Sequence, residues 1–329
     1  MHVIHKLVLG LLALPAASQA ATLVPVTPPP SAVQTIVFGI NKHGEITGSW
    51  LDSSNVTHGF FGPLNGTYTS FDYGGATTGT VPRALDDDGN IVGFASGPNL
   101  YVGTEFLRQA DGTIVTIEKN GASLDGVAQG ITSKGTESTG DYVTDPNTGV
   151  RTGYLASDGV YQTDVTLQLD ELTTNPRGIN SAGTLAGFYR AQNDVTMRGF
   201  IFKKGIVEVI NADDSGTTSL EGINKKELAS GQVLDNEGNP HSFVFNNKTG
   251  LFTSINIQDG SNEQQAWGIN DKAQVAVTTG IGASYIYCVN DHQCPRGGHK
   301  ITEGRSWKID PNSASHAGTG VKQHSGVLR

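Results

Sequence analysis

A ten-residue pattern that recurs along most of the chain is the feature that most constrains its fold. The pattern is G-I-N-x-x-G-x-I-x-G, and it is clearest at residues 39–48 and 178–187. Successive copies are 44 to 48 residues apart. The chain therefore repeats one unit of about 46 residues, and repeats of this length indicate a structure built from stacked copies of a single unit. The copies are anchored by an Ile or Leu at Ile40, Leu85, Ile131, Ile179, Ile223 and Ile269.

Each repeat contains four short segments that read as β-strands. The first ends in G-I-N, the second contains x-I-x-G, the third carries an aromatic residue, and the fourth alternates apolar and polar residues, as at 206–210. Four strands in 40 to 50 residues are typical of a propeller blade, whereas a β-solenoid would have shorter repeats. The sequence predicts an all-β fold, a six-bladed β-propeller of four-stranded repeats. The recurring aromatics are then expected to pack in the core: Phe60, Phe106, Tyr154, Phe200, Phe243 and Tyr285.

The N-x-x-G part of the pattern predicts a tight turn between the first two strands. Its Asn or Asp side chain can accept hydrogen bonds from the backbone, and its Gly can adopt the positive φ that such a turn requires. Two acidic runs, at 86–90 and 235–239, resemble calcium-binding loops. The run at 86–90 lies in the register of the ordinary repeat turn, and a turn is favoured for both over a calcium site.

The ends of the chain differ in composition from the repeats. Residues 1–20 have a basic start, a short apolar run and a small-residue cleavage region, which predicts a signal peptide and a secreted protein, extracellular or periplasmic. The apolar run is shorter than the roughly 20 residues that span a bilayer, so a soluble mature protein is expected. We expect a Pro-rich linker at 21–32, the propeller at 33–310 with a final strand within 300–310, and a flexible basic tail at 311–329.

The two cysteines allow two interpretations. Cys288 and Cys294 would form a disulfide in an oxidising compartment, and this is the favoured interpretation. Together with His292 and His299 they also form a C-x3-H-x-C-x4-H series with ligand types that suit tetrahedral zinc. That spacing matches no common zinc module, so the sequence predicts neither a metal nor another cofactor.

These repeats resemble a known family. G-I-N-x-x-G-x-I-x-G at 39–48, followed by His58-Gly59-Phe60, and the same pattern at 178–187, followed by Arg198-Gly199-Phe200, resemble the bacterial extracellular repeats called HAF repeats. The resemblance covers about residues 35 to 290. It departs from the pattern in the third copy and in the sixth, where Ala273 replaces the turn glycine. The family implies export and a repeat propeller, and it supplies no activity that can be assigned to particular residues.

One position in the repeat varies in a way that suggests ligand binding. Two residues before each anchor, the first strand carries an aromatic, a charged or an amide side chain, and these positions should converge near the mouth of a central channel. Arginine can hold a carboxylate or phosphate through two hydrogen bonds, and a tryptophan ring can stack on a sugar. The alternative is that these are variable, solvated loop positions. The candidate ligand-binding residues are Phe38, Arg83, Gln129, Arg177, Glu221 and Trp267.

The charge of the chain limits its partners. The formal net charge is −9, and −10 without Lys6 of the signal segment. Nucleic acid is therefore not an expected partner. Acidic loops precede the first strands of the repeats and could attract cations or keep the protein soluble, the second being favoured. These loops hold Asp72, Glu118, Asp125, Asp164, Asp170, Glu171, Asp213, Asp214, Asp259 and Glu263.

Function follows only in outline from the sequence. We find no nucleophile elbow, metalloprotease motif, phosphate-binding loop or nucleotide fingerprint. A secreted binding or interaction module for polysaccharide or another extracellular polymer is favoured over an enzyme. The alternatives are a carbohydrate-active hydrolase or lyase at the channel mouth, using Arg83, Arg177 and Glu221 on an acidic sugar, and a purely structural surface protein. Oligomeric state does not follow from the sequence.

Overall fold

The computed structural model describes most of the chain from residue 21 onward. The described residues are 21–74, 79–96, 103–192, 194–212, 217–235, 237–261, 263–301, 306–308 and 321–325. The predicted signal peptide lies outside them.

The described residues form an all-β fold. Their only helix is a single 3₁₀ turn, Asp291–Gln293. None of their helices is long and apolar enough to cross a membrane. The strands form antiparallel meanders in which neighbours in sequence are neighbours in the sheet. The first meander is β2 (Gln34–Ile40), β3 (Glu45–Leu51), β4 (Thr57–Pro63) and β5 (Thr69–Phe71), and the second is β6 (Gly79–Leu85), β7 (Ile91–Ser96), β8 (Gly103–Arg108) and β9 (Ile114–Thr116). The third is β12 (Asp125–Ile131), β13 (Ser138–Asp145), β14 (Val150–Ser157) and β15 (Val160–Val165), and the fourth is β16 (Glu171–Ile179), β17 (Leu185–Ala191), β18 (Arg198–Lys203) and β19 (Ile206–Asn211). The fifth is β20 (Thr218–Ile223), β21 (Leu228–Leu234), β22 (Pro240–Asn246) and β23 (Leu251–Ser254), and the last is β24 (Gln264–Ile269), β25 (Gln274–Thr279) and β26 (Ser284–Cys288).

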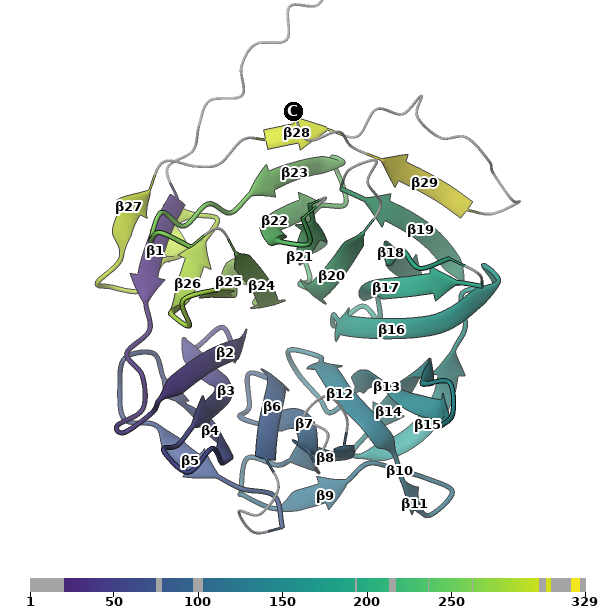
Figure 1. The fold of residues 1–329 in the computed structure, drawn as a ribbon, viewed down its shortest axis with the longest axis horizontal. Helices are drawn as coiled ribbons and strands as arrows, with labels where there is room; N and C mark the ends of the chain where they lie inside the picture. Colours follow the sequence, from purple (N-terminus) through teal and green to yellow (C-terminus); the bar gives the residue numbers. More distant parts are fainter. Residues whose placement is uncertain are drawn as a thin grey trace, which may run out of the picture.

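The meanders are arranged around a central axis as in a β-propeller. The first strand of each lies nearest the axis and the later strands lie progressively further out (Figure 1). Each inner strand contacts the next around the ring, and the last, β24, contacts the first, β2. The second and third meanders also join into one sheet, because β12 pairs with β8. That sheet includes a small hairpin of β10 (Glu118–Lys119) and β11 (Ala122–Ser123).

The N-terminal strand completes the last meander. β1 (Ala21–Pro25) pairs antiparallel with β26, with Thr22 opposite Cys288. Its side chains enter the core, since Ala21, Leu23 and Val24 are buried. Residues 21–25, which were expected in the Pro-rich linker at 21–32, instead form this strand. The prolines that follow indicated a linker, but the short apolar segment before them pairs with the free edge of β26.

Three short C-terminal strands lie along the outer edges of the last meanders. β27 (His299–Ile301) pairs with β1, β28 (Ser306–Lys308) with β23, and β29 (Val321–Ser325) runs parallel to β19 (Figure 1). A strand was expected within 300–310, but the two found there extend different sheets. Residues 321–325 of the predicted tail form β29.

The repeat motif places a small residue beside a large one in each core. The last glycine of the motif lies directly opposite the aromatic of the third strand, as Gly48 does opposite Phe60. A Cβ on Gly48 would lie 2.0 Å from the Ile36 carbonyl oxygen and 3.0 Å from the Phe60 ring. Five of the aromatics predicted to be core residues are fully buried. Tyr285 is only half-buried, because Val277 stands opposite it in place of a glycine.

The two cysteines form a disulfide. Cys288 and Cys294 are bonded, with their Cα atoms 5.6 Å apart. The predicted disulfide is present, and both sulfur atoms of the alternative zinc site are used in it. Among the described residues no group of His, Cys, Asp and Glu is arranged to hold a metal ion.

Candidate functional site: the central channel

The candidate ligand-binding residues occupy equivalent β-bulges. In each inner strand the pairing with the second strand shifts by a residue or two just before the G-I-N motif, for example between Val37 and Gly39. A bulge leaves its extra residue out of the regular ladder and can redirect the side chain. All of the predicted residues line the same narrow part of the channel. They are the bulged positions Phe38, Arg83, Gln129, Arg177, Glu221 and Trp267.

The channel is wide at one end and narrow through the rest of its length. A cavity of about 720 Å³ opens where the inner strands begin, and Arg83, Arg177 and Trp267 are among the residues that line it. At the level of the bulges the channel is narrower, and the space there is about 60 Å³. We call this section the waist. Beyond the waist, a space of about 50 Å³ is lined by the anchors and the Asn residues of G-I-N.

The first glycine of the motif makes the waist narrow. A Cβ on Gly178 would lie 2.7 Å from the Cα of Gly222 in the next repeat, and one on Gly222 would lie 3.2 Å from the Cα of Gly268. Inner strands can approach this closely only without side chains on the facing positions. This role of the G in G-I-N was not apparent from the sequence, because it depends on contact between repeats.

Arg83 is held between two aromatic rings. Its guanidinium carbon lies 4.2 Å from the centroid of Phe38 and 4.7 Å from that of Trp267. Its Nε donates a hydrogen bond to Gln129 Oε1 at 3.0 Å. No carboxylate among the described residues forms an ion pair with it. Burial in the channel, together with repulsion by Arg177, lowers the pKa of Arg83 to about 9.

Arg177 has a different environment from Arg83. Its Nη1 donates to Glu221 Oε2 at 3.1 Å, and its guanidinium lies 5.1 Å from the centroid of the Phe188 ring. The other oxygen of Glu221 accepts a hydrogen bond from the Ser219 hydroxyl at 2.6 Å. Arg177 Nε is buried without a hydrogen-bond partner. Both Glu221 oxygens are thus occupied, while Arg177 keeps unused donors.

Two further arginines line the wide cavity and were missed in the sequence analysis. Arg151 lies near the start of β14 and pairs with the buried Asp141, whose pKa is raised by burial despite that pairing. Arg190 lies near the end of β17, and no ion pair is found for it among the described residues. Arg190 lies three residues after the last glycine of the motif, and the equivalent residue of the first repeat, Leu51, lines the cavity too. That register was the signal available in the sequence.

Two aromatic residues of the candidate site, Phe38 and Trp267, hold Arg83 in place. Phe38 is buried, and both its ring and that of Trp267 contact the Arg83 guanidinium. The two rings also contact each other, with centroids 4.9 Å apart. Their packing fixes the position of Arg83, since a guanidinium is attracted to the faces of aromatic rings.

Several acidic residues of the rim are engaged within the protein. Asp72 accepts a hydrogen bond from His58 at 3.1 Å, and Asp164 accepts one from the Tyr142 hydroxyl at 2.8 Å. Glu171 accepts hydrogen bonds from the backbone N–H groups of Leu167 and Leu169. These carboxylates stabilise their own loops. The predicted rim residues Asp213 and Asp214 lie outside the described residues.

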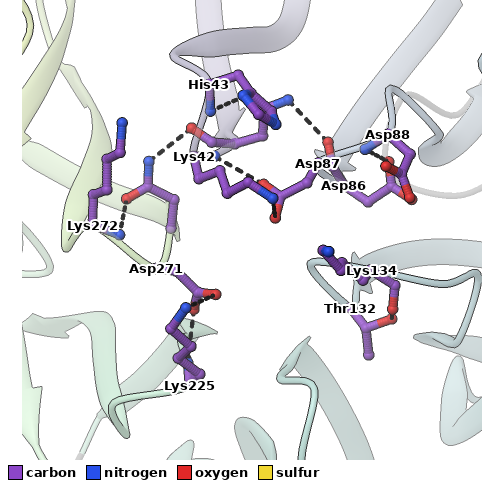
Figure 2. Close-up of polar contacts among 12 residues, drawn as sticks. Lys42, His43, Asp86, Asp87, Asp88, Thr132, Lys134, Lys225, Asp271 and Lys272 are labelled. Carbon is purple, nitrogen blue, oxygen red and sulfur yellow. Dashed lines mark hydrogen bonds and ion pairs between the residues drawn. The ribbon is translucent and has the colours of Figure 1, made fainter.

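At the narrow end, contacts between neighbouring repeats surround the channel, and several of them are drawn in Figure 2. The amide of each motif Asn donates to the backbone of the next repeat: Asn180 to Asn224, Asn224 to Asn270, Asn270 to Asn41, and Asn41 to Asp86, over 2.8 to 3.1 Å. Lys42 also pairs with Asp87 at 2.9 Å and Lys225 with Asp271 at 3.2 Å. We call the chain of Asn contacts the asparagine belt.

The acidic runs form turns, as the sequence favoured. Asp86 Oδ1 accepts hydrogen bonds from the N–H groups of Asp88 and Asn90. Asp235 accepts them from Glu237 and Asn239 in the same way.

Comparison with known proteins assigns the chain to no family. No family model matches the chain, and no curated protein matches it. Among solved structures it is similar to TolB from Acinetobacter baumannii at 12% identity and a TM-score of 0.42, over 87% of this chain and 65% of that one. It is also similar to the WD40 β-propeller domain of Doa1, at 8% identity and 0.43, over 83% and 99% of the two chains. A third is an Aleuria aurantia lectin in complex with α-methyl-L-fucoside, at 10% identity and 0.44, over 84% and 97%. Similarities at this level do not bear on ligand or activity.

Proposed function

We propose that this chain is an exported binding module, a six-bladed propeller of repeats of about 46 residues, that holds a negatively charged ligand in its wide cavity. A polysaccharide or another extracellular polymer with acidic groups has the required chemistry. One observation carries the proposal. In a protein of net charge −9, no Asp or Glu is among the described residues that line the cavity, whereas four arginines line it. These arginines are Arg83, Arg151, Arg177 and Arg190.

The arginines are arranged for binding an anion. Two of them have carboxylate partners behind the cavity wall, Arg151 with Asp141 and Arg177 with Glu221. The other two, Arg83 and Arg190, form no ion pair with a carboxylate of the described residues, and their guanidinium groups remain available to an anion. Guanidinium groups form paired hydrogen bonds with carboxylates and phosphates, and these are stronger at a site partly shielded from water.

The cavity favours binding over hydrolysis. A glycosidase of the common type needs two carboxyl groups on either side of the bond to be cleaved. Glu221, the acid proposed from the sequence, does not line the wide cavity, and both of its oxygens accept hydrogen bonds from protein groups. A hydrolase or lyase therefore receives less support from the site than a binding module does.

Export is proposed chiefly from the sequence. The signal-like segment at 1–20 and the resemblance of the repeats to HAF repeats support it. The disulfide between Cys288 and Cys294 agrees with an oxidising compartment.

The proposal is tested by comparing acidic and neutral polymers. Wild type and the double variant Arg83→Gln with Arg177→Gln are measured by calorimetry against polygalacturonate and against neutral dextran at low salt. We expect binding of the acidic polymer only, weakened at least tenfold in the double variant and by added salt. Arg198→Ala is the matched control, because Arg198 pairs with Asp194 and does not line the cavity.

Two results would contradict this proposal. One is equal binding of dextran and polygalacturonate, and the other is equal binding by the double variant and wild type. Release of shortened or unsaturated sugars during the incubation would favour the enzyme instead.

A further inference from the structure

We infer that the wide cavity captures the end of an acidic chain, with a compact oxyanion on the terminal residue bound at the Arg83–Arg177 floor. This inference rests on the proposed function and adds which part of the ligand enters the site. It follows from the shape of the channel and from the chemistry of its floor.

The dimensions of the channel allow entry but no passage. A volume of about 720 Å³ is in the range of roughly 300 to 1,000 Å³ that holds a small ligand. The waist has only about 60 Å³, which is room for a few water molecules. The waist is lined by the six bulged side chains and by the motif glycines, and close backbone contacts such as that between Gly178 and Gly222 keep neighbouring inner strands from moving further apart or closer together. A polymer therefore cannot thread through, and its first residue must stop above the waist.

The floor presents donors held in place before any ligand arrives. Arg83 is fixed by Phe38, Trp267 and its bond to Gln129, and only its Nε has a hydrogen-bond partner among the described residues. A guanidinium has five N–H donors, so four remain for a ligand. Arg177, fixed by Glu221, lies close enough for its charge to lower the pKa of Arg83. Donors fixed in this way lose little entropy when they bind.

An oxyanion at this level relieves the repulsion between the two arginines. Two guanidinium groups that repel each other are both stabilised when one anion binds between them. The shared chemistry is a carboxylate or a sulfate on a residue of sugar size. Polar groups around it can contact hydroxyls, since Gln129, Thr173 and Asn175 also line the wide cavity.

End capture is tested by changing chain length at constant mass. Polygalacturonate is hydrolysed to mean lengths of about 100, 30 and 10 residues, and each fraction competes against a labelled galacturonate oligomer of about five residues for binding to the mature protein. We expect inhibition per unit mass to increase about tenfold from the longest to the shortest fraction, following the number of chain ends. Free galacturonate should compete too, and a galactose 6-sulfate arm distinguishes sulfate from carboxylate.

The outcomes separate the two proposals. If all lengths inhibit equally per unit mass, the ligand is held along its length, and end capture is wrong while the proposed function stands. If neither the carboxylate nor the sulfate competitors bind, the proposed function itself is wrong.

A substitution tests the floor independently of chain length. Arg83→Lys keeps the charge and removes the planar fork that contacts both rings and the anion. We expect at least a tenfold loss of affinity for the short fraction, and Arg198→Lys, outside the cavity, should leave it unchanged. Unchanged binding by a folded Arg83→Lys protein, with a wild-type melting temperature, would overturn the assignment of the floor.

Discussion

Glu105 is a fully buried carboxyl group between the second and third repeats. Its side chain on β8 accepts a hydrogen bond from the hydroxyl of Tyr154 on β14. Burial raises the pKa of Glu105 well above its ordinary value, and the nearby Asp141 raises it further. The folded protein therefore keeps a proton that a free glutamate would release.

This proton makes the stability of the fold depend on pH. Because the folded-state pKa is raised, the contribution of Glu105 is most favourable below about 4.5 and is lost as the pH increases toward the folded-state value. Glu105→Gln removes the titration and leaves a hydrogen-bonding side chain for Tyr154. We expect the variant to lose less stability than wild type between pH 4.5 and pH 8, measured by urea unfolding. Parallel pH profiles for the two proteins would show that Glu105 titrates normally.

Two glycines of the same repeat are needed for different reasons. Gly44 has a φ of +82°, and an added Cβ there meets nothing within 4 Å. Gly44→Ala should cost about 1 kcal/mol, from the backbone conformation alone. Gly48→Ala should cost more, because its Cβ would lie 2.0 Å from the Ile36 carbonyl oxygen and the strands must separate. Chemical denaturation of both variants checks the order, and a larger loss in Gly44→Ala would reverse this interpretation.

At the level of elements, the asparagine belt joins one meander to the next. Each motif Asn accepts backbone hydrogen bonds inside its own turn through Oδ1, as Asn224 does from Lys226 and Leu228. It also donates through Nδ2 to the following repeat. The N-x-x-G spacing predicts the first contact, which lies within one turn. The second was not anticipated, because it depends on which repeat lies alongside.

An isosteric substitution separates the two contacts of the belt. Asn224→Asp keeps the oxygen that accepts within the turn and removes the amide that donates to Asn270 at 2.9 Å. We expect a loss of about 1 kcal/mol in unfolding free energy. Asn120→Asp, in an exposed turn, serves as the control. Equal effects of the two substitutions would mean that the belt adds no stability.

The elements were more predictable than the way they meet. Spacing and alternation were sufficient to predict the short strands of each repeat and the turn at Asn41. The convergence of the varied positions, Arg83 and Arg177 among them, was also predicted, because equivalent positions of repeats arranged around one axis lie close together near that axis. The bulges, the contact between Gly178 and Gly222, and the use of Trp267 to support Arg83 were not predictable. They depend on distances between repeats that no local pattern encodes.

For the whole molecule, the pairing of β1 with β26 joins segments that are far apart in the chain. Leu23 is 2% exposed and packs in a core cluster with Val277 and Tyr287. Leu23→Ala should lower the unfolding free energy by about 2 to 5 kcal/mol, as for other buried leucines. Thr27→Ala, at an exposed position beyond the strand, should have little effect. Equal melting temperatures for Leu23→Ala and wild type would show that β1 adds no stability.

Because of the same pairing, we expect the product of refolding to depend on protein concentration. Thr22 lies opposite Cys288, so the last meander stays incomplete until nearly the whole chain is present. Until then the edge of β26 is unpaired, and β1 of a second molecule can pair with it, because it has the same residues as β1 of the first. Exchange of an identical element between copies is a known route to dimers. Refolding from dilute solution should therefore yield monomers, and refolding from concentrated solution should yield strand-exchanged dimers and longer chains of linked molecules.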